Sequence, residues 1–178
     1  MPDPGWGLLP RPMPDELFDV VDPQDAVIGT APRARVHAEG LRHRAIHVLI
    51  FNREGQVFLQ KRSMKKDLAK GLWDSSCSGH VDSGEAYDHA AVRELGEELG
   101  LFLRETPTRW FRAEACPETG NEFVWVYRLQ HEGPFVLNPD EIDEGRWIAR
   151  GALETEIATQ TAIFSPAFAY LWLRRPRA

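Results

Sequence analysis

The chain has 178 residues, of which 43% are hydrophobic and 27% are charged, a composition typical of one soluble domain with a sizeable core. Its formal net charge of -6 argues against a polymeric nucleic acid as a partner, because proteins that bind nucleic acids usually carry a basic face. No apolar stretch approaches the roughly 20 residues that span a bilayer, so the sequence predicts no membrane helix.

Residues 1–16 carry five prolines within the first 14 positions. Proline interrupts both helices and strands, so we expect a flexible segment here and a single domain over residues 17–178. The segment lacks the basic and apolar regions of a secretory signal. We therefore expect a cytoplasmic protein in which the two cysteines, Cys77 and Cys116, are free thiols.

The first half of the domain contains three predicted strand regions. Residues 17–28 place apolar arms around the turn-forming segment DPQD, which indicates a short hairpin. Residues 45–51 and 56–62 are strand-like and flank the segment NREG, a good hairpin loop, so these two strands should pair. A loop rich in Lys, Gly and Ser is expected over residues 63–84.

A helix is predicted over residues 85–99 because apolar residues recur there with the helical period. Gly100 stands where a left-handed C-terminal cap is expected. Asp82 and Glu85 have the D-x-x-E spacing of a capping box. The apolar residues that should share the core-facing side are Val92, Leu95 and Leu99.

The second half of the domain is predicted to contain further strands and a closing helix. Residues 108–115 and 121–130 are strand-like and are joined by the turn segment CPETG. A short strand is expected over residues 145–149. Ser165 followed by Pro166 is typical of a helix start, which predicts the closing helix.

Three acidic residues of the predicted central helix, Glu94, Glu97 and Glu98, are spaced so that their carboxylates converge on one face. With no lysine or arginine expected on that stripe, each pair should repel by about a few tenths of a kcal/mol unless a divalent cation intervenes. Magnesium prefers oxygen ligands and often bridges carboxylates to substrate phosphates. Ala90 and Ala91, one turn earlier, would leave room for a ligand. Such a stripe alone is more often a solvated helix face.

Residues 79–101, GHVDSGEAYDHAAVRELGEELGL, extend this stripe into a longer pattern. The pattern is Gly, five residues, Glu, seven residues, then R-E-U-x-E-E-x-G-U with U apolar, and all nine specified positions match. The segment resembles the Nudix box, and the chain is similar to the MutT-like Nudix hydrolase family. The resemblance implies an α/β fold, the Nudix α/β/α sandwich with a mixed β-sheet, which agrees with the predicted order of strands and helices. It also implies an enzyme, a pyrophosphohydrolase that acts on acid anhydrides.

Carried over onto this chain, the resemblance implies a Mg²⁺ site, with Mn²⁺ as a substitute. Arg93 and Glu85 would orient the carboxylates, and a water activated by the metal would attack phosphorus. The implied metal ligands are Glu94, Glu97, Glu98 and the carbonyl of Gly79.

The general base is expected in the box, at Glu97 or Glu98, although Nudix enzymes also take it from a later loop. Arg62 and Lys66, after the second strand of the hairpin, could reach substrate phosphates. A solvated basic loop is nearly as good an interpretation of these two residues. The loop alternatives for the base are Glu141 and Glu144.

The chain also resembles the isopentenyl-diphosphate isomerase branch of the same superfamily, which moves a double bond. That branch uses a cysteine before a Gly-His pair, a metal cage of histidines and two glutamates at alternate strand positions. Here Ser78 occupies the cysteine position, with Cys77 one residue early. Gly120 replaces the first glutamate and leaves only Glu122. The histidines near the metal-ligand positions are His37, His43 and His80.

The expected substrate is a nucleoside di- or triphosphate or a related nucleoside diphosphate derivative. A small phosphorylated molecule is the only partner expected, and the protein should be a monomer or a homodimer. A non-catalytic nucleotide-binding Nudix module is a further alternative, which the complete set of box carboxylates argues against. Aromatic residues in strands are more often part of the core, but some of them could stack on a base. The candidates are Trp110, Phe111, Trp125, Tyr127 and Trp147.

Overall fold

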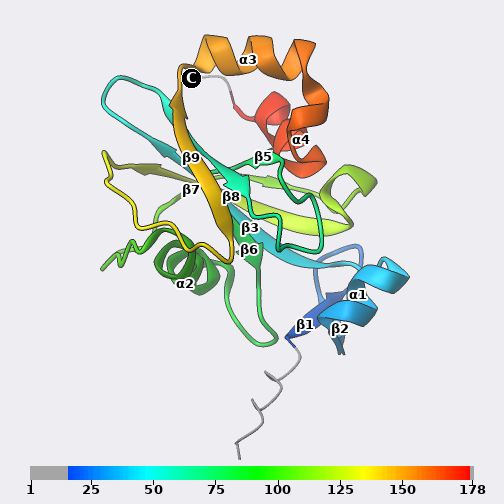
Figure 1. The fold of residues 1–178 in the computed structure, drawn as a ribbon. Helices are drawn as coiled ribbons and strands as arrows, with labels where there is room; N and C mark the ends of the chain where they lie inside the picture. Colours follow the sequence, from blue (N-terminus) through cyan, green and yellow to red (C-terminus); the bar gives the residue numbers. More distant parts are fainter. Residues whose placement is uncertain (1–15, 177–178) are drawn as a thin grey trace, which may run out of the picture.

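A mixed sheet of seven strands forms the centre of the computed structural model, which describes residues 16–176 (Figure 1). The strands are β3 (His43–Phe51), β4 (Val57–Arg62), β5 (Trp73–Asp74), β6 (Cys77–His80), β7 (Thr108–Ala113), β8 (Glu122–Gln130) and β9 (Ile142–Ile148). Their order is β5-β4-β3-β8-β7, with β6 paired to β3 and β9 paired to β4. The proline-rich residues 1–15 lie outside the described range, so the expected flexible segment and the domain boundary stay predictions.

The two central strands, β3 and β8, run parallel, with Ile46 opposite Trp125 and Phe51 opposite Gln130. Every other strand pair of this sheet is antiparallel. β3 is buried along nearly its whole length, as expected for a strand covered on both faces. The predicted mixed sheet is therefore confirmed.

The hairpin of β3 and β4 forms as predicted, but the two strands pair only at its closed end, where Phe51 lies opposite Val57. Beyond that point β6 takes the place beside β3 and pairs with it from Ala45 to Val48. Both β5 and β6 fall within residues 63–84, where a loop was predicted. They have two and four residues, too few for a periodic pattern to reveal them.

Helices cover both faces of the sheet, which confirms the α/β/α sandwich (Figure 1). The helix α2 (Tyr87–Leu99) packs on one face, where Ile46, Val48 and Ile50 of β3 point. The helices α3 (Arg150–Thr159) and α4 (Pro166–Arg174) pack on the opposite face, to which Leu49 and Phe51 belong.

The start of α2 differs from the prediction. The helix begins at Tyr87, and its N-cap residue, Ala86, has no side-chain cap, so the predicted capping box is wrong. Asp82 and Glu85 instead close a turn before the helix: the Asp82 amide donates to Glu85 Oε2 at 3.1 Å, and the Glu85 amide donates to the Asp82 carbonyl at 2.9 Å. The predicted cap at Gly100 is confirmed, since this residue has a φ of 62° in the left-handed region.

The buried side of α2 is broader than the predicted apolar stripe. Leu95 and Leu99 are buried as predicted, while Val92 is only half-buried. Ala90 and Ala91 are fully buried against the sheet, so the prediction that they leave room for a ligand is wrong. Their small side chains let the helix approach the sheet closely.

The hairpin predicted over residues 17–28 is confirmed as β1 (Leu17–Val21) and β2 (Val27–Pro32), which pair antiparallel. A short helix that was not predicted, α1 (Arg33–Glu39), follows and packs on the hairpin through a small cluster of Phe18, Ala31 and Val36. This unit lies beside the start of β3 (Figure 1).

The closing helix α4 starts as predicted, with Pro166 in the first turn and Ser165 Oγ accepting a hydrogen bond from the Phe168 amide at 3.1 Å. The preceding helix α3 was not predicted, because its buried residues number only two, Leu153 and Ile157. Short one-turn helices complete the chain at Pro117–Thr119 and Thr161–Ile163. Among the described residues, no helix is both long and apolar enough to cross a bilayer.

Replacing Leu95 with Ala is expected to lower the free energy of unfolding by about 2–5 kcal/mol, because it leaves a cavity between α2 and the sheet. Urea unfolding of both proteins measures the change. The matched control is Leu173→Ala on α4, where the side chain is 64% exposed and its loss should cost under about 0.5 kcal/mol. Equal effects of the two substitutions would contradict the assignment of Leu95 to the anchor of α2.

Candidate functional site

The strand β6 and the helix α2 approach each other closely at Gly79 and Glu94. A Cβ atom added at Gly79 would lie 2.1 Å from Cδ of Glu94, far inside the contact distance of real side chains. Any residue other than glycine would displace the carboxylate. The glycine of the sequence pattern therefore lets the Glu94 carboxylate lie directly against the β6 backbone.

Arg93 holds several of these acidic groups at once. It forms a two-pronged ion pair with Glu85, with Nε at 3.0 Å from Oε1 and Nη2 at 2.8 Å from Oε2. Its Nη1 donates to Glu94 at 2.7 Å and to Glu97 at 3.1 Å, and its Nη2 donates to the carbonyl of His80 at 3.0 Å. The expectation that no cation relieves the acidic stripe is wrong, because the guanidinium of Arg93 reaches it from one side.

Glu98 is the most buried carboxylate of the stripe, with 3% of its surface exposed. It accepts hydrogen bonds from the Ser78 amide at 3.1 Å and from Gln60 Nε2 at 3.0 Å. It forms no ion pair within residues 16–176. Its negative charge is thus stabilised by hydrogen bonds from neutral donors and not by a positively charged side chain in this part of the chain.

Burial raises the pKa of both inner carboxyl groups. The pKa of Glu98 rises because the group is desolvated, and the pKa of Glu94 rises through desolvation and the negative charge of Glu98. Each group therefore binds a proton more readily than a solvated glutamate does when no metal is bound. A divalent cation would replace the protons and stabilise both carboxylates, so the donor set of hard oxygens fits a metal such as Mg²⁺.

The predicted phosphate-binding residues are already engaged with acidic groups. Arg62 lies 3.4 Å from Asp74 Oδ2 and donates from Nε to the Leu68 carbonyl at 3.2 Å. Lys66 forms an ion pair with Glu141. Both side chains lie below one-fifth exposed, so a freely solvated basic loop does not describe them.

The two loop glutamates occupy different environments. Glu141 is near enough to Glu98 for its negative charge to add to the burial that raises the pKa of Glu98. Glu144 lies on β9, 57% exposed, with its Oε2 at 3.8 Å from Nζ of Lys61. The structure therefore brings Glu141, and not Glu144, toward the acidic stripe.

Gln60 was missed by sequence reasoning. It follows the buried apolar residues Val57, Phe58 and Leu59 on β4, and only 1% of its surface is exposed. Its amide donates to Glu98, which explains why a polar side chain is buried at this position. A glutamine that faces inward in the alternating pattern of a strand is the signal that could have identified it.

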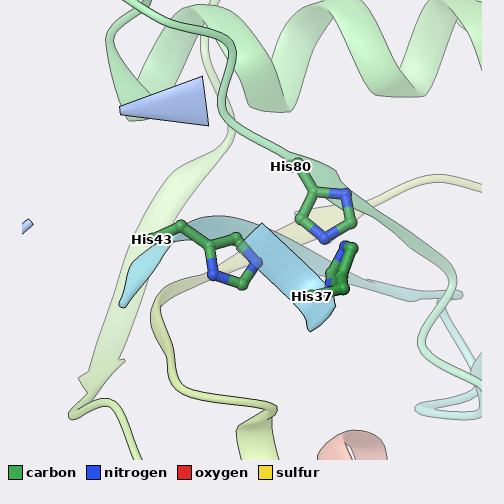
Figure 2. Close-up of side chains that lie close together, drawn as sticks. All are labelled: His37, His43 and His80. Carbon is green, nitrogen blue, oxygen red and sulfur yellow. The ribbon is translucent and has the colours of Figure 1, made fainter. Parts of the chain in front are cut away.

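Three histidines form a second group of possible ligands, as Figure 2 shows. His37 comes from α1, His43 begins β3 and His80 ends β6, and their ring nitrogens all lie within 4.8 Å of one another. Glu122, at the start of β8, accepts a hydrogen bond from His80 Nε2 at 3.1 Å and lies 3.3 Å from His43 Nε2. Although burial alone would raise the pKa of Glu122, the His43 and His80 rings hold it well below the usual range.

Two buried nitrogens of this cluster, Nε2 of His37 and Nε2 of His43, have no hydrogen-bond partner among residues 16–176. The 3.3 Å approach of His43 to Glu122 lacks hydrogen-bonding geometry. His43 donates from Nδ1 to the Leu41 carbonyl at 2.9 Å, so Nε2 is the ring nitrogen left to face the cluster. The cluster could hold a metal that accepts imidazole ligands.

The residues at the isomerase cysteine position do not form a reactive thiol. Ser78 takes that position, and Cys77 is fully buried and faces the core beside Val48. Burial, together with the nearby Glu98 and Glu94, raises the pKa of the Cys77 thiol well above its usual value. A thiol in such surroundings stays protonated and unreactive.

The NUDIX domain family model matches residues 41–168. The chain belongs to the Nudix family. An uncharacterised Nudix hydrolase of Yersinia pestis is 36% identical over 166 residues, which cover 90% of this chain and 87% of that protein. An isopentenyl-diphosphate Δ-isomerase of Photorhabdus laumondii is 35% identical over 139 residues, which cover 75% of this chain and 77% of the isomerase.

Among solved structures, the crystal structure of a Deinococcus radiodurans protein is similar to this chain, with a TM-score of 0.80 and 29% identity, covering 91% of this chain and all of the other. The Nudix domain and the hydrolase relatives identify a hydrolase enzyme. Nudix enzymes generally use a divalent metal and act on small phosphorylated molecules, which agrees with the carboxylates of α2.

Of the five aromatic residues considered for stacking, Trp147 lines a pocket, of about 170 Å³, together with Phe58 and Phe135. The other four pack elsewhere: Tyr127 is fully buried under α2, Trp125 packs beside it, and Trp110 and Phe111 pack on the face of α3 and α4.

In protein freed of metal by EDTA, the Tm of the unchanged protein is expected to fall relative to that of His37→Gln as the pH is lowered from 7 to 5. The pKa of His37 is lowered to about 4, first by burial and then by the nearby His80, His43 and Arg33. An unfolded histidine titrates near 6.5, so the unfolded state binds more protons in this window and stability is lost as the pH falls. His37→Gln should remove this loss of stability at low pH, whereas His89→Gln, at an exposed position, should keep it. Identical slopes for His37→Gln and the unchanged protein would refute this origin.

Proposed function

We propose that this Nudix enzyme hydrolyses a diphosphate linkage in nucleoside di- or triphosphates, or in related nucleoside diphosphate derivatives, with Mg²⁺ as its metal. One observation carries the proposal: on α2, Glu98 is buried, and the neighbouring Glu94, with 13% of its side chain exposed, lies against the Gly79 backbone. Burying two acids this close is costly unless a cation joins them. A divalent ion bound there would also attract substrate phosphates.

The proposed metal ligands are the oxygens of Glu94, Glu97, Glu98 and the Gly79 carbonyl. When bound, Mg²⁺ or Mn²⁺ would neutralise phosphate charge and lower the pKa of a water. Glu97 is 57% exposed and is therefore open to substrate and solvent, whereas Glu98 is enclosed. The geometry supports a site with one open side.

Arg93 and Glu85 act as positioning residues in this proposal. Their two-pronged ion pair fixes the guanidinium, which in turn orients Glu94 and Glu97. A planar guanidinium supports such a geometry better than lysine, because its donors point in fixed directions.

The general base is placed in the box, at Glu97 or Glu98, and Glu141 is the alternative. Both box residues lie on the stripe that would carry the metal, so a metal-bound water would be within their reach. Glu141 is held by Lys66 and would need to leave that ion pair before it could accept a proton.

Arg62 and Lys66 are proposed to bind substrate phosphates. Their present partners are Asp74 and Glu141, and the negative charge of Glu141 acts on Glu98 of the acidic stripe. An arriving diphosphate would compete for the same donors and offer more oxygens to each.

A nucleoside substrate is supported by the aromatic pocket beside the stripe. Phe58 precedes Gln60 by two residues on β4, so both side chains point to the face of α2. Trp147 and Phe135 complete this pocket, with ring centroids 5.3 Å and 4.6 Å from that of Phe58. A planar base would suit such surroundings.

Isomerisation of isopentenyl diphosphate is the second candidate, because the histidine cluster with Glu122 lies next to the box and several relatives carry the isomerase name. Ser78 and the inert thiol of Cys77 argue against it. A non-catalytic nucleotide-binding module is a weaker candidate, since all box carboxylates are present. The cytoplasmic location and a monomeric or homodimeric state stay predictions.

The deciding experiment incubates the purified protein and Mg²⁺ with a panel of nucleoside phosphates, nucleoside diphosphate derivatives and isopentenyl diphosphate. Phosphate or pyrophosphate release and isomer formation are measured separately. Hydrolysis of a nucleotide without isomer formation is the expected result. Isomer formation without phosphate release would favour the isomerase over the hydrolase. Nucleotide binding without turnover of any substrate would favour the non-catalytic module.

Glu97→Gln is expected to lower turnover at least about 100-fold, the scale of losing an important transition-state contact, because it removes a charge without changing the size of the side chain. Initial rates at saturating Mg²⁺ give the comparison. Glu105→Gln, at an exposed position past the end of α2, is the matched control and should keep normal turnover. An unchanged Tm would show that the fold persists, and normal activity of Glu97→Gln would remove Glu97 from the site.

A further inference from the structure

A cavity of about 460 Å³ lies far from the box, at the end of the sheet where β3 and β8 both finish. Phe51 and Gln130, the last residues of these two parallel strands, line it together with the turn that follows β3. The carboxyl ends of adjacent parallel strands are frequent ligand positions in α/β sheets. This cavity therefore occupies a place in the fold where binding sites commonly occur.

Three arginines from different segments converge on the cavity: Arg53 from the turn, Arg128 from β8 and Arg150 from the start of α3. Two of them lie over the same aromatic ring, with the guanidinium carbons of Arg128 and Arg150 at 5.0 Å and 4.9 Å from the centroid of Phe51. Arg128 also lies 5.6 Å from the centroid of Trp110. Guanidinium groups that stack on rings are held in place while their N–H edges stay available to a ligand.

The positive charge at this cavity is poorly balanced. Within residues 16–176, neither Arg128 nor Arg150 forms an ion pair with a carboxylate, and the polar contact of Arg150 is a 3.3 Å hydrogen bond to the Gly55 carbonyl. Arg53 is 83% exposed, and Glu132 Oε1 lies 3.8 Å from its Nε at the edge. Among the described residues, only one carboxylate thus forms an ion pair with any of these three arginines, in a chain whose net charge is -6.

We propose that this cavity is a second binding site, for a small phosphorylated anion that carries at least two negative charges. Arginine side chains from three segments can surround a tetrahedral phosphate and donate to several of its oxygens at once. Thr108 offers a hydroxyl donor in the same lining. The chain begins α3 at Arg150 without a side-chain cap, so the partial positive charge of that helix end adds to the field.

The site is separate from the Nudix box. Phe51 belongs to the face of the sheet that α3 and α4 cover, whereas the box helix α2 packs on the opposite face. Along β3, eight residues separate Phe51 from His43 of the histidine cluster, which corresponds to roughly 26 Å. A ligand in the cavity would therefore leave the box free, and its binding requires no metal.

The test titrates the metal-free protein in EDTA with inorganic pyrophosphate and follows the amide NMR signals. Without a divalent cation the acidic stripe repels an anion, so the expected shifts are at Gly55 and Thr108 and not at Gly79. Inorganic phosphate should shift the same signals more weakly. Citrate serves as a carboxylate control, and equal binding of citrate would overturn the assignment to phosphate.

The variant Arg128→Gln/Arg150→Gln should raise the Kd for pyrophosphate at least about tenfold, because it removes two charge-assisted donors. Arg104→Gln, an exposed arginine on the side of α2, is the matched control and should bind like the unchanged protein. Circular dichroism checks that each variant is folded. Absence of binding to the unchanged protein in EDTA, or equal Kd values for the double variant and the control, would overturn the proposal.

Discussion

The site depends on one electrostatic constraint: four carboxylates lie together beside the backbone of β6, and within residues 16–176 Arg93 is the one cation that forms ion pairs with them. Arg93 contacts three of these groups, Glu85, Glu94 and Glu97, and leaves Glu98 to a backbone amide and the Gln60 side chain. Like charges this close repel strongly where water is excluded. Burial raises the pKa of Glu94 and of Glu98, because solvent stabilises these two negative charges poorly. A divalent ion held by these carboxylates would restore the balance.

The sheet provides this arrangement by separating β4 from β3 after a single pair and admitting β6 between them. The backbone of β6 at Ser78 and Gly79 then faces α2, and the Gln60 side chain faces the same helix from β4. The next residue, His80, belongs to the histidine cluster, and its carbonyl accepts a hydrogen bond from Arg93. The carboxylates of α2 and the histidine cluster are thus adjacent, and β6 contributes to both of these groups. The relatives of this chain include proteins named as hydrolases and proteins named as isomerases.

The sequence was sufficient for the parts of the fold that have a strong local pattern. The hairpins, the box helix with its cap at Gly100 and the start of α4 at Ser165 all follow from periodicity and capping residues. The short strands β5 and β6 were missed because pairing with distant strands, and not local preference, defines them. For the site, spacing predicted which carboxylates share a helix, but it could not show that Arg93 bends back onto Glu94. Nor could it show that Gln60 meets Glu98, since that contact depends on the sheet.

The most direct test of the account is calorimetric titration of the protein with Mg²⁺, which prefers oxygen ligands and therefore reports on the carboxylates rather than on the histidines. The account predicts that the unchanged protein binds Mg²⁺ and that Glu98→Gln weakens binding at least about tenfold, because the substitution removes a charged ligand from the buried pair. Failure of the unchanged protein to bind Mg²⁺, even with a nucleoside diphosphate present, would contradict it, as would equal affinities in the two proteins.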